Sequence, residues 1–104
     1  MSSPTQRSLA YLRAEGWAVD VVERYNSFTR RRHDLFSIAD LFAVREAEVM
    51  LVQTTSGSNV SARIKKIADA EHMPALRRAG VRVVVHGWRK AANGRWALRV
   101  VDCS

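Results

Sequence analysis

The sequence predicts an α/β fold in which helices flank a mixed central sheet of about five strands. Segments rich in β-branched residues alternate with segments of helical periodicity. In the second half of the chain a helical segment separates two strand-like segments, as a crossover between parallel strands requires. The dipeptide Asn93-Gly94 is typical of tight hairpin turns and predicts an antiparallel strand at the end of the chain.

The first predicted helix begins after Ser3 and ends at Gly16. Ser3 supplies an N-cap oxygen, Pro4 suits the first helical position, and Gly16 readily adopts the left-handed conformation that ends a helix. Residues 17–22 predict a strand, because aromatic and β-branched side chains dominate there. Residues 24–33 are polar and carry the densest positive charge of the chain, so we expect a structureless loop.

The middle of the chain predicts a hairpin followed by a helix. Residues 38–44 and 48–54 form two strands joined by a short polar turn. The apolar run inside the second strand is typical of a strand covered on both faces. Turn-forming residues at 56–59 precede apolar side chains at helical spacing over residues 60–68.

The last third predicts a short helical turn at 75–79 and two strands, at 81–86 and 96–101. The expected order is therefore helix, three strands, helix, short helix and two strands. A chain of 104 residues suits one compact domain, so we expect residues 1–104 to form a single domain.

Arginine dominates the charge of the chain. Lysine and arginine together number 17 against 10 acidic residues, which gives a formal net charge of +7. A guanidinium group binds two phosphate oxygens at once, so this excess favours nucleic acid as the partner. The alternative is a solvated arginine-rich surface that reflects codon usage alone.

Other classes of protein are disfavoured by the composition. The single cysteine, Cys103, excludes an intramolecular disulfide framework and a thiolate metal cluster. No apolar run approaches the about 20 residues of a membrane-spanning helix, and the N-terminus lacks the apolar core of a signal peptide. These features predict a soluble protein of the cytoplasm with no membrane partner.

Three polar residues are expected at one edge of the sheet. Asp40 lies in the second predicted strand, and Gln53 and Thr55 end the third. Residues two apart in a strand face the same side, so an aspartate on the neighbouring strand can share a hydrated cation with Gln53 and Thr55. Strands disfavour aspartate, which indicates that Asp40 has a partner or a function. The structural alternative is an ion pair with Arg63 or Arg82.

This spacing and the order of the elements resemble the PD-(D/E)XK nuclease superfamily, in particular its Holliday-junction-resolvase-like branch and small phage proteins of that type. The resemblance extends from the first helix through Gly87 and implies a restriction-endonuclease-like αβββαβ core. It places Asp40 at the metal-binding aspartate, Gln53 at the second acidic ligand and Thr55 at the lysine. Only Asp40 keeps the residue type of the family. Asp34 is the counterpart that the resemblance offers for an additional acid of some members.

The resemblance implies a DNA-binding, metal-dependent endonuclease or a Holliday-junction-resolvase-like phosphodiesterase. Its catalytic residues would be Asp40, Gln53 and Thr55, and Mg²⁺ or Mn²⁺ would lie at Asp40, Gln53 and Asp34. The expected partner is DNA, including branched DNA, and a homodimer is expected because resolvase-like relatives act as dimers. A phage-encoded member would act in the host cytoplasm. The side chains expected to bind the nucleic acid are Arg30, Arg31, Arg32, Arg63, Lys65 and Lys66.

The departures from the family motif leave two alternatives open. Gln53 offers Mg²⁺ a neutral oxygen in place of a charged one, and Thr55 cannot supply the lysine charge, which would have to come from Lys65, Lys66 or an arginine of 30–32. The first alternative is a catalytically inactive nuclease-fold protein that binds nucleic acid or a host protein as a regulator or inhibitor. The second is a basic RNA-binding domain, which requires the charge alone.

Overall fold

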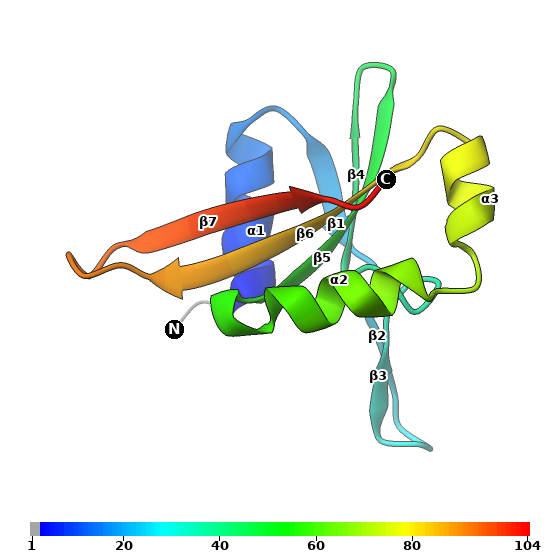
Figure 1. Ribbon diagram of the computed structural model, residues 1–104, viewed down its shortest axis with the longest axis horizontal. Helices are drawn as coiled ribbons and strands as arrows, with labels where there is room; N and C mark the ends of the chain where they lie inside the picture. The colour runs from blue at the N-terminus through cyan, green and yellow to red at the C-terminus, as the bar shows by residue number, and fades with distance from the viewer. Residues whose placement is uncertain (1–2) are drawn as a thin grey trace.

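The computed structural model describes residues 3–104 and contains a mixed five-stranded sheet with helices on both faces (Figure 1). The strand order is β1-β4-β5-β6-β7, in which β5 and β6 are parallel and the other neighbours antiparallel. The α/β class and the mixed five-stranded sheet are therefore confirmed. The strands are β1 (Ala18–Val21), β4 (Leu41–Arg45), β5 (Glu48–Ser56), β6 (Arg82–Lys90) and β7 (Trp96–Asp102).

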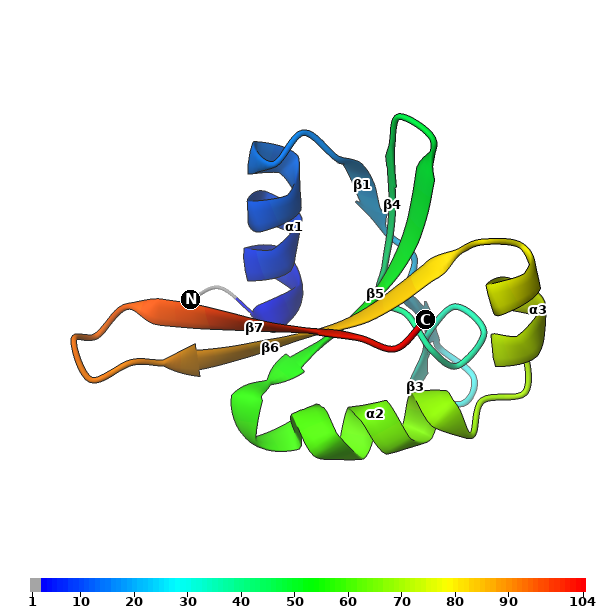
Figure 2. The ribbon, with the colours of Figure 1, turned by 45° about the horizontal axis from the view of Figure 1, so that its top comes forward.

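One face of the sheet is covered by α1 (Pro4–Ala14), and the other by α2 (Val60–Ala68) and α3 (Met73–Arg78), with the short helix η1 (Gly57–Asn59) leading into α2 (Figure 2). Each face of the sheet packs against its helices in a separate hydrophobic core, and alternate residues of β5 point into the two cores. Met50 and Val52 pack on the side of α1, and Leu51 packs on the side of α2. No helix within residues 3–104 is long and apolar enough to cross a membrane.

The predicted start and end of the first helix are confirmed. The Oγ of Ser3 accepts a hydrogen bond from the backbone N–H of Gln6 at 3.1 Å, and Pro4 occupies the first turn. Gly16 adopts a φ of 88°, which lets the chain leave the helix and enter β1. The helix therefore reaches the sheet edge with its first turn beside the end of β5, where Thr5 contacts Thr54.

The expectation of a structureless loop over residues 24–33 is wrong. Strands β2 (Arg24–Asn26) and β3 (Arg31–His33) form a separate antiparallel sheet, and we call residues 24–33 the arm. The arm extends away from the body of the protein, below α2 in Figure 1. Both strands are exposed along their length, so they lack the alternation of apolar and polar residues by which strands are predicted.

Asp40 lies immediately before β4, whereas the sequence predicted a strand from residue 38. Its backbone is nevertheless paired on both sides, because its N–H donates to the carbonyl of Val52 at 2.9 Å and its carbonyl accepts from Val22 at 2.8 Å. Phe36 and Ser37 have left-handed φ angles of 55° and 60°, so the chain turns sharply before this point. The turn brings the segments that contain Asp34 and Asp40 to the same edge of the sheet.

The turn between β6 and β7 has three residues rather than the two that Asn93-Gly94 predicts. The N–H of Ala91 donates to the carbonyl of Arg95 at 2.7 Å, which leaves residues 92–94 as the loop. Gly94 has a φ of 81°, and a left-handed residue at the end of a three-residue loop is a common hairpin arrangement. Strand β6, which follows α3, is also longer than the strand predicted at 81–86, since it continues to Lys90.

Gly87 permits the close packing of α2 on β6. A Cβ atom at this position would lie 2.3 Å from the Cγ2 atom of Val60, the first residue of α2. A side chain at this position therefore requires Val60 or the backbone around it to move. Because α2 also carries Arg63 and Lys66, this contact determines where their charges lie relative to the sheet edge.

We predict that Gly87→Ala lowers the free energy of unfolding by about 1–3 kcal/mol, the usual cost of overpacking a core. The double variant Gly87→Ala with Val60→Ala is expected to recover part of that loss, because it removes the methyl group that collides with the new Cβ. Urea denaturation of the two variants, of Val60→Ala and of the parent gives the coupling energy. Strictly additive effects would contradict the packing described.

His86 is a buried, neutral side chain on the α1 face of β6. Its Nδ1 lies 2.9 Å from the Oγ of Ser8, which also accepts a hydrogen bond from the indole N–H of Trp88 at 2.8 Å. Since the serine oxygen is an acceptor for Trp88, its hydroxyl proton is available to donate to the imidazole. Burial lowers the pKa of His86 from 6.5 to about 4.

A depressed histidine pKa makes folding pH-dependent. The unfolded chain binds a proton near pH 6.5 and the folded chain only near pH 4, so stability is complete above the upper value and is lost as the pH falls between them. We predict a loss of about 3 kcal/mol over this window. His86→Gln should remove most of this slope in urea denaturation from pH 7 to pH 4. Equal slopes for the variant and the parent would contradict the assignment.

Candidate metal and nucleic-acid site

An open cleft of about 920 Å³ lies at the sheet edge where β5 ends. It is bounded by the first turn of α1, the ends of β1 and β5, the base of the arm and one side of α2. Charged side chains of both signs line it. The lining residues are Ser3, Pro4, Thr5, Gln6, Val21, Glu23, Tyr25, Arg32, Asp34, Asp40, Gln53, Thr54, Thr55, Ser56, Arg63 and Lys66.

The carboxylate of Asp40 is 4% exposed and is held by β5. Its Oδ2 accepts hydrogen bonds from the Nε2 of Gln53 at 2.8 Å, the backbone N–H of Thr54 at 2.8 Å and the hydroxyl of Thr54 at 2.9 Å. A buried carboxylate is stable only with such partners. The three donors therefore fix its position at the edge of the sheet.

Thr54 extends this network to the first helix. Its hydroxyl lies 2.8 Å from the hydroxyl of Thr5 and donates to Asp40, so Thr5 is the donor in the contact between the two threonines. Thr54 is the central residue of the triplet 53–55. Sequence analysis selected the residues on either side of it as site residues and missed Thr54. The signal was weak, because a threonine at a strand end is ordinary and its partner on α1 is distant in sequence.

Three carboxylates converge on the cleft. One ligand oxygen each from Glu23, Asp34 and Asp40 lies within 4.8 Å of the others. The pKa of Asp34 is raised, first because the group is partly buried and then because Asp40 lies close to it, while Lys66 opposes the shift. Carboxylates in such proximity repel one another, which favours the binding of a cation or a proton between them.

Basic side chains compensate part of this negative charge. The Nζ of Lys66 lies 3.4 Å from the Oδ2 of Asp34, and a guanidinium nitrogen of Arg32 lies 3.3 Å from a carboxylate oxygen of Glu23. Arg63 lines the same cleft. The acidic cluster is therefore surrounded by groups that can bind the phosphate oxygens of a ligand.

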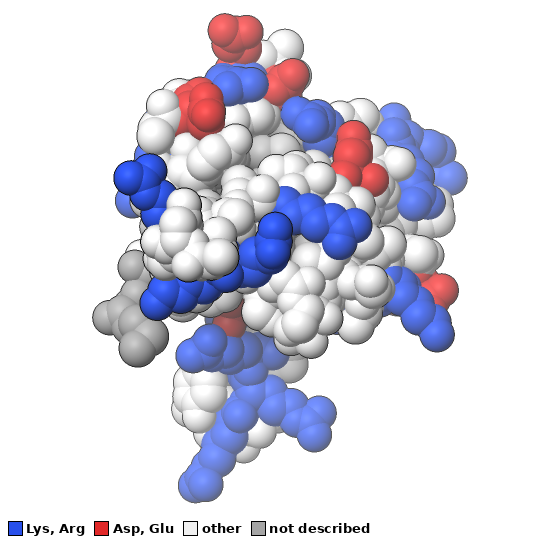
Figure 3. Space-filling view, turned by 60° about the vertical axis from the view of Figure 1, so that its left-hand side comes forward, with Lys and Arg blue, Asp and Glu red and all other residues white. Residues whose placement is uncertain are grey.

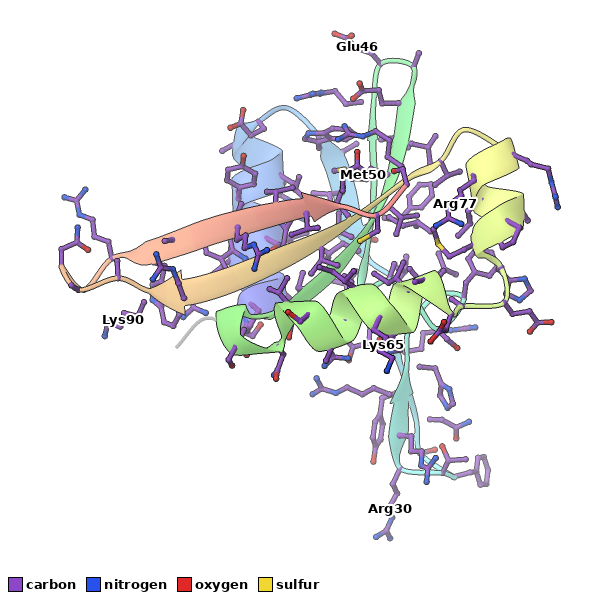
Figure 4. All side chains as sticks on the ribbon, in the orientation of Figure 1. Arg30, Glu46, Met50, Lys65, Arg77 and Lys90 are labelled. Atoms are coloured by element: carbon purple, nitrogen blue, oxygen red, sulfur yellow. The ribbon has the colours of Figure 1, made fainter. Side chains whose placement is uncertain are left out.

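The structure brings most of the sequence-predicted site residues together. Asp34, Asp40, Gln53 and Thr55 all line the cleft, as do Arg32, Arg63 and Lys66. Arg30, Arg31 and Lys65 do not line it. Figure 4 shows Arg30 at the far end of the arm and Lys65 on α2.

Gln53 does not present its oxygen to the acidic cluster. Its amide nitrogen faces Asp40, and its Oε1 is buried without a hydrogen-bond partner among the described residues. The third carboxylate that could hold a cation is Glu23, which sequence analysis missed. An acid directly after a predicted strand was the available signal, but nothing in the sequence showed that the end of β1 lies beside Asp34 and Asp40.

The structural alternative for Asp40 was an ion pair with Arg63 or Arg82. The partners observed are the neutral donors of Gln53 and Thr54. Arg82 is instead 3.9 Å from a carboxylate oxygen of Glu48, at the other end of the sheet.

Comparison of this chain with protein-family models, curated proteins and solved structures finds no match in any of the three. The cleft and the arm are therefore the features from which a function can be inferred.

We predict that Asp40→Ala lowers the free energy of unfolding by about 3 kcal/mol, because it leaves the buried donors of Gln53 and Thr54 without an acceptor. Thr54→Val keeps the backbone hydrogen bond and should cost only about 1–2 kcal/mol. Asp69→Ala, which removes an exposed aspartate at the end of α2, serves as the control and should change stability little. Equal effects of Asp40→Ala and Asp69→Ala would contradict the network.

Proposed function

We propose that this chain is a DNA-binding protein of nuclease type that holds a divalent cation, Mg²⁺ or Mn²⁺, at Glu23, Asp34 and Asp40. The observation that carries the proposal is the convergence of these three carboxylates, within 4.8 Å of one another, in a cleft that also contains Arg63 and Lys66. Negative ligands for a metal beside positive groups for a phosphate suit a phosphodiester substrate.

The ligand set fits a hard cation. Carboxylate oxygens are the preferred ligands of Mg²⁺ and Mn²⁺. Partial burial and then the neighbouring Asp40 raise the pKa of Asp34, and a cation between the two carboxylates would offset both effects. Gln53 is a second indication, because its side chain is 2% exposed, contacts Asp40 and retains an unpartnered Oε1. Rotation of the amide by half a turn exchanges its nitrogen and oxygen, which would offer the carbonyl oxygen to a cation at Asp40.

The element order supports a restriction-endonuclease-like core. The series α1, β1, β4, β5, α2 and β6 follows the αβββαβ order of the PD-(D/E)XK nucleases, with the arm inserted between β1 and β4 and the short helix α3 between α2 and β6. Asp40, immediately before β4, lies beside the second half of β5, as the family motif requires. In this assignment Glu23 and Asp34 replace the acid that Gln53 lacks.

The chain supplies a substitute for the missing lysine. Thr55 lines the cleft without a charge, but Lys66 reaches the same acidic cluster from α2. We assign Lys66 the role of stabilising charge on the phosphate, and Arg32 and Arg63 that of binding its oxygens. A bound divalent cation would supply a polarised phosphate oxygen and a more acidic water molecule.

One observation favours the second candidate, a nuclease-fold protein that binds DNA or a host protein without cleaving. The Oδ2 of Asp40 already accepts three hydrogen bonds that hold the sheet edge together, so this oxygen has less capacity to bind a metal ion. Metal affinity and cleavage distinguish the two candidates, whereas DNA binding alone does not.

The test combines metal binding with cleavage. We expect Mg²⁺ or Mn²⁺ to raise the melting temperature of the parent, and Glu23→Gln or Asp34→Asn to weaken binding by about tenfold or more. These two variants are preferable to Asp40 variants, because neither side chain belongs to the buried network. Asp69→Asn is the matched control. Labelled duplex, single-stranded and four-way-junction DNA should be cut in the presence of Mn²⁺ by the parent and the control only.

The outcomes separate the candidates. Metal binding with cleavage that Lys66→Ala abolishes supports the nuclease. Salt-sensitive DNA binding without cleavage, with or without a bound metal, supports the inactive binding protein. A chain that binds neither a divalent cation nor any of the three DNA forms contradicts the proposal as a whole.

A further inference from the structure

The arm is the most exposed and most basic segment of the protein. Its four arginines lie at positions 24, 30, 31 and 32, and Figure 3 shows the basic side chains gathered on this projection. Within residues 3–104, the ion pair between Arg32 and Glu23 is the one that neutralises an arginine of the arm. The other three arginines are available to a negatively charged ligand.

The tip of the arm presents an aromatic side chain to solvent. Phe28 is 98% exposed, the highest value among the large apolar side chains, and Tyr25 on the same arm is 64% exposed. The tip backbone is held by Asn26, whose Oδ1 accepts from the N–H of Phe28 at 2.9 Å and from the N–H of Thr29 at 3.3 Å. Such a turn keeps Phe28 at the end of the ribbon, away from any core.

The two faces of the arm differ in their relation to the cleft. Tyr25 pairs with Arg32 across the ribbon, so both side chains lie on one face, and both line the cleft. Arg24 and Arg31 belong to pairs that face the other way. A ligand bound along the first face therefore passes from the arm directly to the acidic cluster.

An exposed phenylalanine among arginines suits nucleic acid with an unpaired base. Arginines bind the phosphates, and an aromatic ring stacks on a base with a gain of about 1–3 kcal/mol. A two-stranded ribbon fits the major groove, about 12 Å wide, but the bases of a continuous duplex already stack on one another. Phe28 gains a stacking partner without the cost of unstacking neighbouring base pairs only where a base is unpaired.

We propose that the arm binds DNA at an interruption of the duplex and that Phe28 stacks on the unpaired base. This inference rests on the DNA binding proposed above and adds a specificity to it. The face that contains Tyr25 and Arg32 then directs the adjoining strand to the cleft, so that the position of the unpaired base determines which phosphate lies at the acidic cluster.

The test measures binding in EDTA, which separates it from metal binding and cleavage. The probes are a labelled duplex with one unpaired 2-aminopurine and the same duplex with that base paired to thymine. We expect the parent to prefer the interrupted duplex, and its binding to quench the 2-aminopurine fluorescence. Phe28→Ala should lose about tenfold in affinity for the interrupted duplex and little for the continuous one. Phe28→Trp should restore both the preference and the quenching.

Two further variants serve as controls. Trp96→Ala removes another exposed aromatic, from the hairpin of β6 and β7, which projects from the molecule in a different direction from the arm (Figure 1), and should bind both probes as the parent does. Arg30→Ala, at the far end of the arm (Figure 4), should weaken binding to both probes alike and reduce its salt dependence, as expected for a phosphate contact.

The outcomes distinguish this inference from the proposed function. If the parent binds DNA but Phe28→Ala shows the same preference and quenching, the stacking role is wrong and DNA binding stands. If the parent binds neither probe, both are wrong. Dimerisation of the parent that Phe28→Ala abolishes, without a change in DNA binding, would assign the tip to self-association and overturn the inference.

Discussion

The buried carboxylate of Asp40 is the interaction on which the rest of the candidate site depends. One of its oxygens accepts hydrogen bonds from Gln53 and Thr54, and Thr54 in turn contacts Thr5 on α1. The same few atoms therefore join β4, β5 and the first helix at one edge of the sheet. A buried negative charge that lacked these donors would cost several kcal/mol. With these donors, the Asp40 carboxylate is held in one position, and Glu23 and Asp34 lie beside it.

The cleft and the arm have different roles in the function that we propose for the protein. The cleft gathers three carboxylates with Lys66, Arg32 and Arg63, an arrangement that suits a cation and a phosphate side by side. The arm carries arginines and an exposed aromatic tip, which suit the backbone and the bases of the nucleic acid. Tyr25 and Arg32 belong to both, so a strand bound by the arm leads to the cleft.

The sequence predicted the parts of the fold that bury apolar side chains. Strands β1, β4 and β5 and helix α2 each have a face toward a core, and the hairpin of β4 and β5 placed Asp40 beside Gln53 as expected. The arm was missed because it has no buried face and so no apolar period. Glu23 was missed because the bend before β4 brings Asp34 and Asp40 beside it, and Thr54 was missed because its partner lies on α1. Neither arrangement can be predicted from the neighbouring residues in the sequence. Gln53 was expected as a ligand from its residue type, but the direction of its amide depends on Asp40.

We propose that Glu23, Asp34 and Asp40 together bind one divalent cation. Paramagnetic broadening of backbone amide NMR signals by substoichiometric Mn²⁺ tests it most directly, because the effect falls steeply with distance from the metal. A cation bound by these three carboxylates should broaden the signals of Glu23, Asp34, Asp40 and Thr54 most strongly and that of Gly94, in the distant hairpin, least. Broadening centred on other acidic residues, such as Asp69 and Glu71, or none at all, would contradict it.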